Sequence, residues 1–109
     1  MQVSKVLVTI LALSAATLTL SAAADGKDLY TKSCLKCHGA DGVGATVMGK
    51  KTGAKDFTDA AVQAKFTDAQ FAKAIKEGYE GEKGKMKAYD ELTTEEVNAL
   101  VAYTRSFKK

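Results

Sequence analysis

The pattern of apolar and polar residues predicts a helix at the start of the folded domain. Leu29, Tyr30 and Cys34 recur at the spacing of one helical face, in a segment that begins at Asp25. Gly39 then favours a helix end, because glycine readily adopts the backbone conformation found after a last helical turn. We therefore expect a helix from Asp25 to the residues just before Gly39.

Two further helices are marked by capping boxes, in which a threonine and a residue three positions later cap each other's backbone amides. Thr67 and Gln70 have this spacing, and an apolar stripe follows until Gly78 stops the helix. Thr93 and Glu96 have it again, before an apolar face made of Val97, Leu100, Val101 and Thr104. Both segments are predicted to be helical.

The remaining segments show no long period. Residues 39–55 are rich in glycine and are predicted to be a loop that wraps around something, whereas residues 58–64 favour a short helix. Residues 79–92 are irregular again, and no segment alternates with period two for long enough to predict a strand. The fold class predicted is all-α.

The N-terminus has the layout of a secretory signal peptide. Lys5 precedes an apolar run over residues 6–20 and a small-residue end at residues 22–24, which predicts cleavage after Ala24. The run is shorter than the ~20 residues of a membrane-spanning helix and is interrupted by hydroxyl side chains, which disfavours a permanent anchor. We expect an exported, for example periplasmic, protein whose mature domain is residues 25–109.

The size and charge of the chain limit the classes of protein to which it could belong. A chain of this length forms one domain that buries little surface, and such domains commonly need a disulfide, a metal or another staple. The formal net charge is only +3 over 109 residues, with the two signs interspersed, which argues against nucleic acid as a partner. We expect a monomer whose mature form does not span a membrane.

Both cysteines and the only histidine lie in the sequence CLKCH, from Cys34 to His38. Positions i, i+3 and i+4 share one face of a helix, so Cys34, Cys37 and His38 are expected to point the same way. Zinc would need further ligands, and the chain has no other Cys or His. A redox dithiol or a plain disulfide suits an exported protein better, but the dithiol expects a βαβ setting and neither accounts for His38.

The C-x-x-C-H pattern favours covalent attachment of haem c. In such sites each thiol adds across one vinyl group of the porphyrin, and the histidine is the proximal ligand of the iron. A large apolar plate would also supply the core that a short chain lacks. We therefore predict haem c bound to Cys34 and Cys37, with His38 as an iron ligand.

Over residues 25–109 the sequence resembles the small bacterial class I monohaem cytochromes c. Gly26 and Tyr30 have the spacing of that family's N-terminal helix, Leu100 and Tyr103 look like its partners on the C-terminal helix, and CHGADGVG looks like the attachment site with the following loop. The resemblance implies three to five helices wrapped around one covalently bound haem, with the first and last helices packed against each other.

The resemblance also implies an axial methionine in the segment GKMKAYDEL, at Met86. The competing Met48 lies ten residues after His38, in the loop on the proximal side, whereas the segment of Met86 can cross to the opposite face. Lys85 or Lys87 could replace the sulfur when deprotonated. The predicted iron ligands are His38 and Met86.

The chain departs from the family pattern because it has no proline. Family members often use a proline carbonyl to hold the imidazole N–H, and often have a second proline after the axial methionine, where this chain has Lys87. The acceptor for His38 is therefore left open. The donors to the haem propionates are also open, among Lys50, Lys51, Thr52, Lys55 and the tyrosines.

A haem with two axial protein ligands has no open position for a substrate, so we expect an electron-transfer protein and not an enzyme. The predicted function is an exported one-electron carrier that shuttles between larger redox complexes. One alternative is a five-coordinate haem that binds a small gas or acts as a peroxidase, and another is a subunit of a larger oxidoreductase. Redox proteins are the expected partners, through a basic surface formed by Lys36, Lys83, Lys85 and Lys87.

Overall fold

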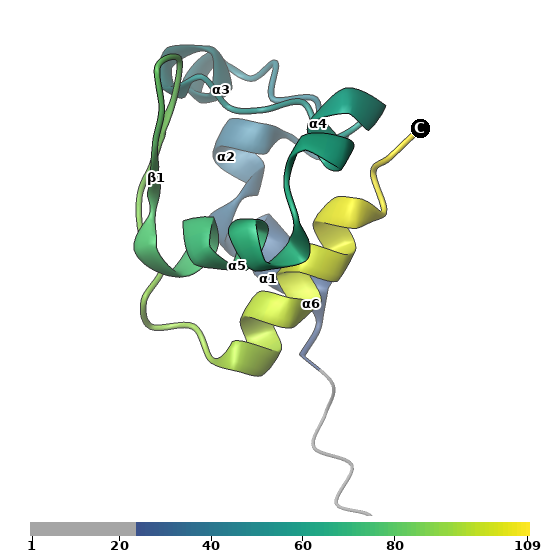
Figure 1. Ribbon diagram of the computed structural model, residues 1–109, viewed down its shortest axis with the longest axis vertical. Coiled ribbons are helices and arrows are strands. Elements are labelled where there is room, and N and C mark those ends of the chain that lie inside the picture. Colours follow the sequence, from purple (N-terminus) through teal and green to yellow (C-terminus); the bar gives the residue numbers. More distant parts are fainter. Residues whose placement is uncertain (1–23) are drawn as a thin grey trace, which may run out of the picture.

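The computed structural model describes residues 24–109, so the predicted signal peptide lies outside the described residues apart from Ala24. The described part is mostly helical, as predicted (Figure 1). Its elements, in chain order, are α1 (Gly26–Ser33), α2 (Leu35–His38), α3 (Val47–Thr52), α4 (Ala60–Lys65), α5 (Asp68–Glu77), β1 (Tyr79–Glu80), β2 (Lys85–Met86) and α6 (Thr94–Arg105).

Six helices occur within residues 24–109, more than the three to five expected. One reason is that the predicted N-terminal helix is divided at Cys34, whose φ of −115° and ψ of −26° depart from regular helix geometry. The other is that α3 lies in the predicted loop. Thr46 caps α3 by accepting from the Gly49 amide, and Gly53 ends it at a left-handed φ of 68°. The six residues of α3 include Gly49 and two lysines, so they show no apolar period in the sequence.

The structure also contains two short strands that the sequence did not predict, because β1 and β2 pair in an antiparallel ladder. Tyr79 is opposite Met86 and Glu80 is opposite Lys85. Each strand has only two residues, so a period-two alternation has no room to appear.

The two predicted capping boxes are confirmed. The Thr67 side chain accepts from the Gln70 amide at 3.1 Å while the Gln70 side chain accepts from the Thr67 amide at 2.8 Å. Thr93 and Glu96 exchange the equivalent bonds at 3.1 and 3.0 Å. These local bonds begin α5 and α6 where the sequence predicted.

The first and last helices pack against each other, as the family resemblance implied. At Gly26 the two backbones approach so closely that a Cβ atom would lie 2.5 Å from the Ala99 carbonyl oxygen. The Tyr30 and Tyr103 rings lie 5.0 Å apart between centroids. Tyr30 and Leu100 are the most deeply buried large side chains of the described residues, with 2% and 1% exposed. This crossing forms the centre of the apolar core.

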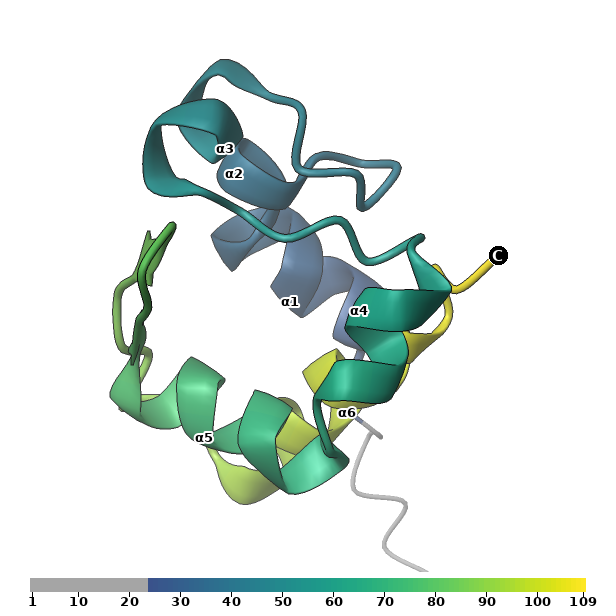
Figure 2. The ribbon, with the colours of Figure 1, turned by 45° about the horizontal axis from the view of Figure 1, so that its top comes forward.

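The remaining elements are arranged around this crossing. In Figure 2, α2 and α3 lie at the top, α5 lies at the bottom, and the β pair and α4 lie on the two sides. Arg105 of α6 holds the α4–α5 connection, because its Nη2 donates to the Phe66 carbonyl at 2.7 Å and its guanidinium lies 4.5 Å from the Phe71 ring centroid. Within residues 24–109, no helix has both the length and the apolar character needed to cross a membrane.

Candidate functional site

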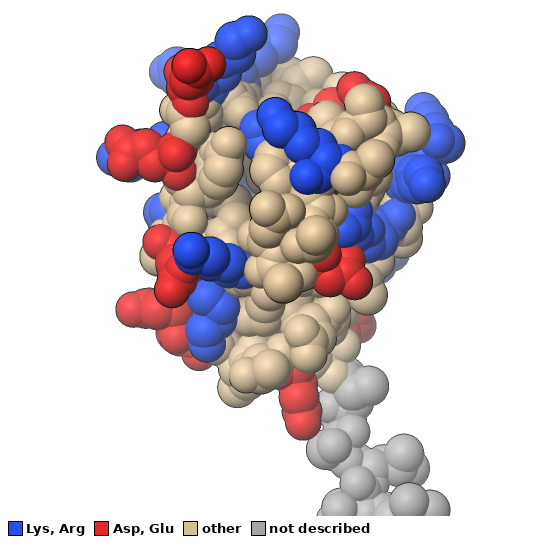
Figure 3. Space-filling view, viewed as in Figure 1, with Lys and Arg blue, Asp and Glu red and all other residues tan. Residues whose placement is uncertain are grey.

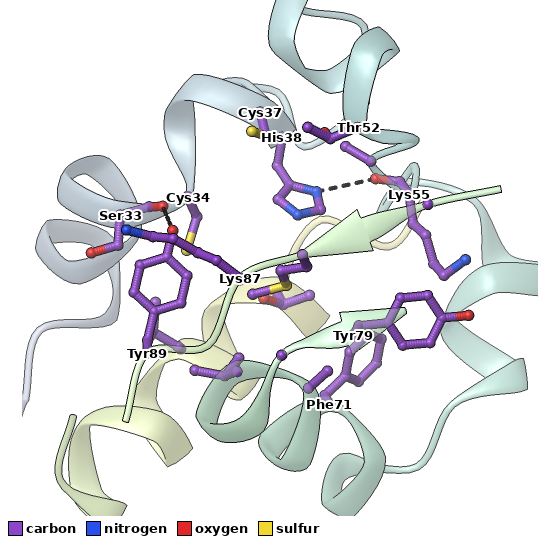
Figure 4. Close-up of a pocket in the computed structure, with 18 of the residues that line it drawn as sticks. Ser33, Cys34, Cys37, His38, Thr52, Lys55, Phe71, Tyr79, Lys87 and Tyr89 are labelled. Carbon is purple, nitrogen blue, oxygen red and sulfur yellow. Dashed lines mark hydrogen bonds between the residues drawn. The ribbon is translucent and has the colours of Figure 1, made fainter. Parts of the chain in front are cut away.

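A cavity of about 960 Å³ lies between these elements. Its volume is at the upper end of the ~300–1,000 Å³ typical of small-molecule and cofactor pockets. Its wall includes Leu100 of the core crossing, Ile75 and Phe71 of α5, and residues of α2 and of the β pair. The close-up in Figure 4 shows side chains from these elements converging on one space.

Cys34, Cys37 and His38 all line this cavity, so the structure brings together the three residues that the motif singled out. His38 continues the helical turn that begins at Cys34, because its amide donates to the Cys34 carbonyl at 2.9 Å. Figure 4 shows His38 pointing into the pocket beside the two sulfur atoms. The local helix geometry therefore presents two thiols and one imidazole to the same space.

The orientation of His38 is set by two residues that sequence reasoning did not assign to it. His38 Nδ1 lies 3.3 Å from the Lys55 carbonyl oxygen, and a carbonyl can only accept, so Nδ1 carries the proton and Nε2 keeps its lone pair. The Phe57 ring stacks on the imidazole at a centroid distance of 4.3 Å and an angle of 18°. The Lys55 carbonyl is therefore the acceptor for the imidazole N–H, which in the resembled family is often a proline carbonyl.

The protonation of His38 also suits a metal ligand. Burial lowers the pKa of His38 below its usual value, and the hydrogen bond with the Lys55 carbonyl opposes this effect only in part. The imidazole is therefore neutral at pH 7, as a metal-binding nitrogen must be.

The Cys34 thiol does not have the character of a redox nucleophile. Burial, with a smaller contribution from Cys37, raises the pKa of Cys34 to about 11. Reactive dithiols instead depend on a lowered thiol pKa, because the thiolate is the nucleophile. The environment of Cys34 therefore disfavours the dithiol alternative.

Met86 and Met48 differ in their relation to the cavity. Among the described residues, Met86 lines the cavity and Met48 does not. Met86 lies on β2, whose chain continues to Tyr89, and the Tyr89 hydroxyl donates to the Ser33 carbonyl at 2.7 Å. This bond ties the segment of Met86 to the residue directly before Cys34. Sequence reasoning missed this role of Tyr89, and no local signal points to it.

The turn between β1 and β2 reaches across to α3. A Cβ atom at Gly53 would collide with the Lys83 carbonyl oxygen, and it would lie 2.8 Å from the Gly84 Cα. Only glycine allows this approach, since Gly53 also has a left-handed φ. The contact joins the segment that carries Met86 to the segment that follows His38.

Four lysines were predicted to form a basic surface, and all four are exposed. Lys36, Lys85 and Lys87 line the cavity, whereas Lys83 lies at the turn of the β pair. Acidic residues lie among them, since Glu80 is paired with Lys85 in the sheet. The face drawn in Figure 3 likewise carries blue and red side chains side by side.

Among the candidate propionate donors, the structure separates two groups. Thr52, Lys55 and three tyrosines line the cavity, and the tyrosines are Tyr30, Tyr79 and Tyr89. Lys50 and Lys51 are not among the described residues that line it.

The chain matches one family of proteins and several solved structures. Residues 21–103 match the family described as cytochrome c oxidase, cbb3-type, subunit III. The solved structure of the KustC0563 c-type cytochrome is 42% identical, with a TM-score of 0.67 and coverage of 78% of this chain and 99% of that one. A point mutant of Kustc0563 is also 42% identical, with a TM-score of 0.65 and coverage of 77% and 99%.

A larger protein is similar as well. The Kuenenia stuttgartiensis reducing HAO-like protein complex Kustc0457/Kustc0458 matches with 26% identity and a TM-score of 0.60, over 76% of this chain and 41% of that one. A search of curated proteins returned no significant match.

Proposed function

Because the chain belongs to the c-type cytochrome family described as cytochrome c oxidase, cbb3-type, subunit III, we propose that it is an exported one-electron carrier with His/Met axial ligation. Covalently bound haem c is the cofactor of c-type cytochromes, and it supplies the chemistry by cycling its iron between the ferric and ferrous states. Members of the family are typically exported, which agrees with the predicted signal peptide and a periplasmic location. The residues of the protein would bind the haem, orient it and shield it from water.

The residues of the cavity fit the cofactor. Cys34 and Cys37 would form the two thioether bonds, and the Nε2 atom of His38 would be the proximal ligand, since its Nδ1 atom is held by the Lys55 carbonyl. Phe57, Phe71 and Leu100 provide apolar walls that exclude water. An apolar wall favours the reduced centre, because the oxidised centre carries one more positive charge.

A single observation carries the proposal for the sixth ligand: Met86 lines the same cavity as His38, and Met48 does not. A thioether is a soft ligand that suits both iron oxidation states and raises the reduction potential. With His38 and Met86 both bound to the iron, no position would be open to a substrate. This is the basis for proposing an electron carrier and not an enzyme.

The test compares Met86→Leu with the matched control Met48→Leu. Both changes replace a thioether by an apolar side chain of similar volume, so packing is largely kept in each. We expect the weak long-wavelength sulfur-to-iron charge-transfer band of the oxidised protein to disappear in Met86→Leu and to remain in Met48→Leu. A band that survives the loss of Met86 would refute the assignment and weaken the carrier proposal.

The five-coordinate alternative makes the opposite prediction for the wild-type protein. If no side chain occupied the sixth position, carbon monoxide would bind the reduced protein rapidly, as it is expected to do in Met86→Leu. We expect slow or incomplete binding to the wild type, because the methionine must be displaced first.

Redox proteins are the partners that this function requires, and one structural neighbour is itself part of a reducing HAO-like complex. We propose that Lys36, Lys83, Lys85 and Lys87 steer an acidic partner surface toward the cavity mouth. Screening over about 8 Å at physiological ionic strength would then slow association as salt is added. An electron-transfer rate to a physiological partner that does not change with salt would refute the steering role.

A further inference from the structure

The proposed electron carrier uses the backbone carbonyl of Lys55 but assigns no role to its side chain. Its backbone carbonyl holds His38, but its ammonium extends along the cavity to a different place. The Lys55 Nζ atom lies 5.1 Å from the centroid of the Tyr79 ring and 5.4 Å from that of the Phe66 ring. Two aromatic rings therefore hold one partly buried cation against the wall of the cavity.

This cation lacks an acidic partner within residues 24–109. The ion pairs in this part of the chain join Lys73 to Glu77 and Arg105 to Asp68, and neither includes Lys55. A charge that is partly removed from water is costly unless an opposite charge or a strong acceptor compensates it. The cavity beside Lys55 is the space in which an anionic group could do so.

The position of Lys55 relative to the cysteines identifies that group. Figure 4 shows Lys55 and Tyr79 on the side of the pocket opposite Cys34, with His38 between the two sides. In a porphyrin of this type the two propionate carboxylates are on the edge opposite the two vinyl groups. A haem joined through its vinyl edge to Cys34 and Cys37 would therefore direct its carboxylates toward Lys55.

We propose that the Lys55 ammonium, held against the Tyr79 and Phe66 rings, is the counter-charge for the haem propionates. This inference rests on the proposed function, because it requires haem attached at Cys34 and Cys37. Lys55 would then act twice, by orienting the imidazole through its carbonyl and by neutralising a propionate through its side chain. The first contact belongs to the backbone and survives substitution, so the second can be tested separately.

The test is a redox titration at fixed pH and ionic strength of the wild type and of Lys55→Met, Lys55→Arg and Lys65→Met. Lys65 is the matched control, because its ammonium lies 5.6 Å from the same Phe66 ring but it is exposed and does not line the cavity. Losing a cation beside a carboxylate near the iron stabilises the ferric state. We expect a lower midpoint potential in Lys55→Met, with a shift several times that of Lys65→Met, and a potential close to wild type in Lys55→Arg.

Infrared difference spectra between the two oxidation states give an independent readout, because the carboxylate bands should change in Lys55→Met and stay unchanged in Lys65→Met. Equal shifts of potential in Lys55→Met and Lys65→Met would overturn the proposal. So would a Lys55→Arg potential as low as that of Lys55→Met, since the charge would then not be what matters. Failure of the proposed function is a separate result: a pyridine haemochrome spectrum of the wild type without the signature of haem c.

Discussion

The hydrogen bond from the Tyr30 hydroxyl to the Gly39 carbonyl connects α1 to the segment after His38, and its contribution to stability can be measured. The hydroxyl donates to the Gly39 carbonyl at 2.6 Å, across a contact that is buried between α1 and the turn after His38. Burial raises the pKa of Tyr30 well above its usual value, so the hydroxyl stays protonated and remains a donor at any ordinary pH. Tyr30→Phe removes this one bond and keeps the ring, with its 5.0 Å contact to Tyr103.

The expected loss of stability in Tyr30→Phe depends on which hydrogen bonds the Gly39 carbonyl still accepts. Leaving a buried acceptor with no partner costs about 1–3 kcal/mol. The Gly39 carbonyl also accepts from the Gly42 amide at 3.2 Å, so it is not left wholly unpaired. We therefore expect a loss of about 1–2 kcal/mol in the free energy of unfolding. For a domain of 60–100 residues this lowers the melting temperature by about 4–16 °C.

The control is Tyr89→Phe, which removes a bond of nearly the same length, 2.7 Å, from the Tyr89 hydroxyl to the Ser33 carbonyl. That contact is only partly buried, so water can replace the lost donor and the expected cost is about 0.5–1 kcal/mol. The assay is denaturant unfolding of the haem-loaded proteins, followed by far-UV circular dichroism. A cost for Tyr30→Phe no greater than that for Tyr89→Phe would refute the reasoning from burial.

Three further changes test the core and its dependence on the cofactor. Leu100→Ala should lower the free energy of unfolding by about 2–5 kcal/mol in a denaturant titration, because Leu100 is 1% exposed, whereas the exposed Asn98→Ala should change it by less than about 0.5 kcal/mol. Gly26→Val should cost about 1–3 kcal/mol by the same assay, and a neutral result would show that α1 and α6 can separate freely. The double variant Cys34→Ala, Cys37→Ala should be largely unfolded, and native-like helix content by circular dichroism would contradict the view that haem completes the core.

Local features of the fold were predictable because their causes lie within a few residues of each other. The capping boxes at Thr67 and Thr93 bind residues only three positions away, and both begin helices as expected. The close approach at Gly26 was predictable in another way, from the family resemblance. The capping boxes, unlike the contact at Gly26, do not require knowledge of the rest of the chain.

Helix α3 and the two strands were missed for a related reason, although the equally short α4 (Ala60–Lys65) lies where residues 58–64 were predicted to be helical. The six residues of α3 make less than two full turns, and a strand of two residues contains no repeat of the period-two alternation. Their existence depends on neighbours: α3 lies against α2, where a Cβ atom at Gly49 would collide with the Cys37 carbonyl. The surroundings, and not an apolar period, make this segment helical.

The sequence alone determined that Cys34, Cys37 and His38 share one face, because the pattern is local and one helical turn brings its members together. The tertiary structure decided what surrounds them. The carbonyl that orients His38 comes from a residue 17 positions later, and the Tyr89 hydroxyl reaches a carbonyl 56 positions earlier. Backbone carbonyls occur at every residue, so sequence cannot show which one a side chain will meet; only the packing of the helices around a shared cavity makes that choice.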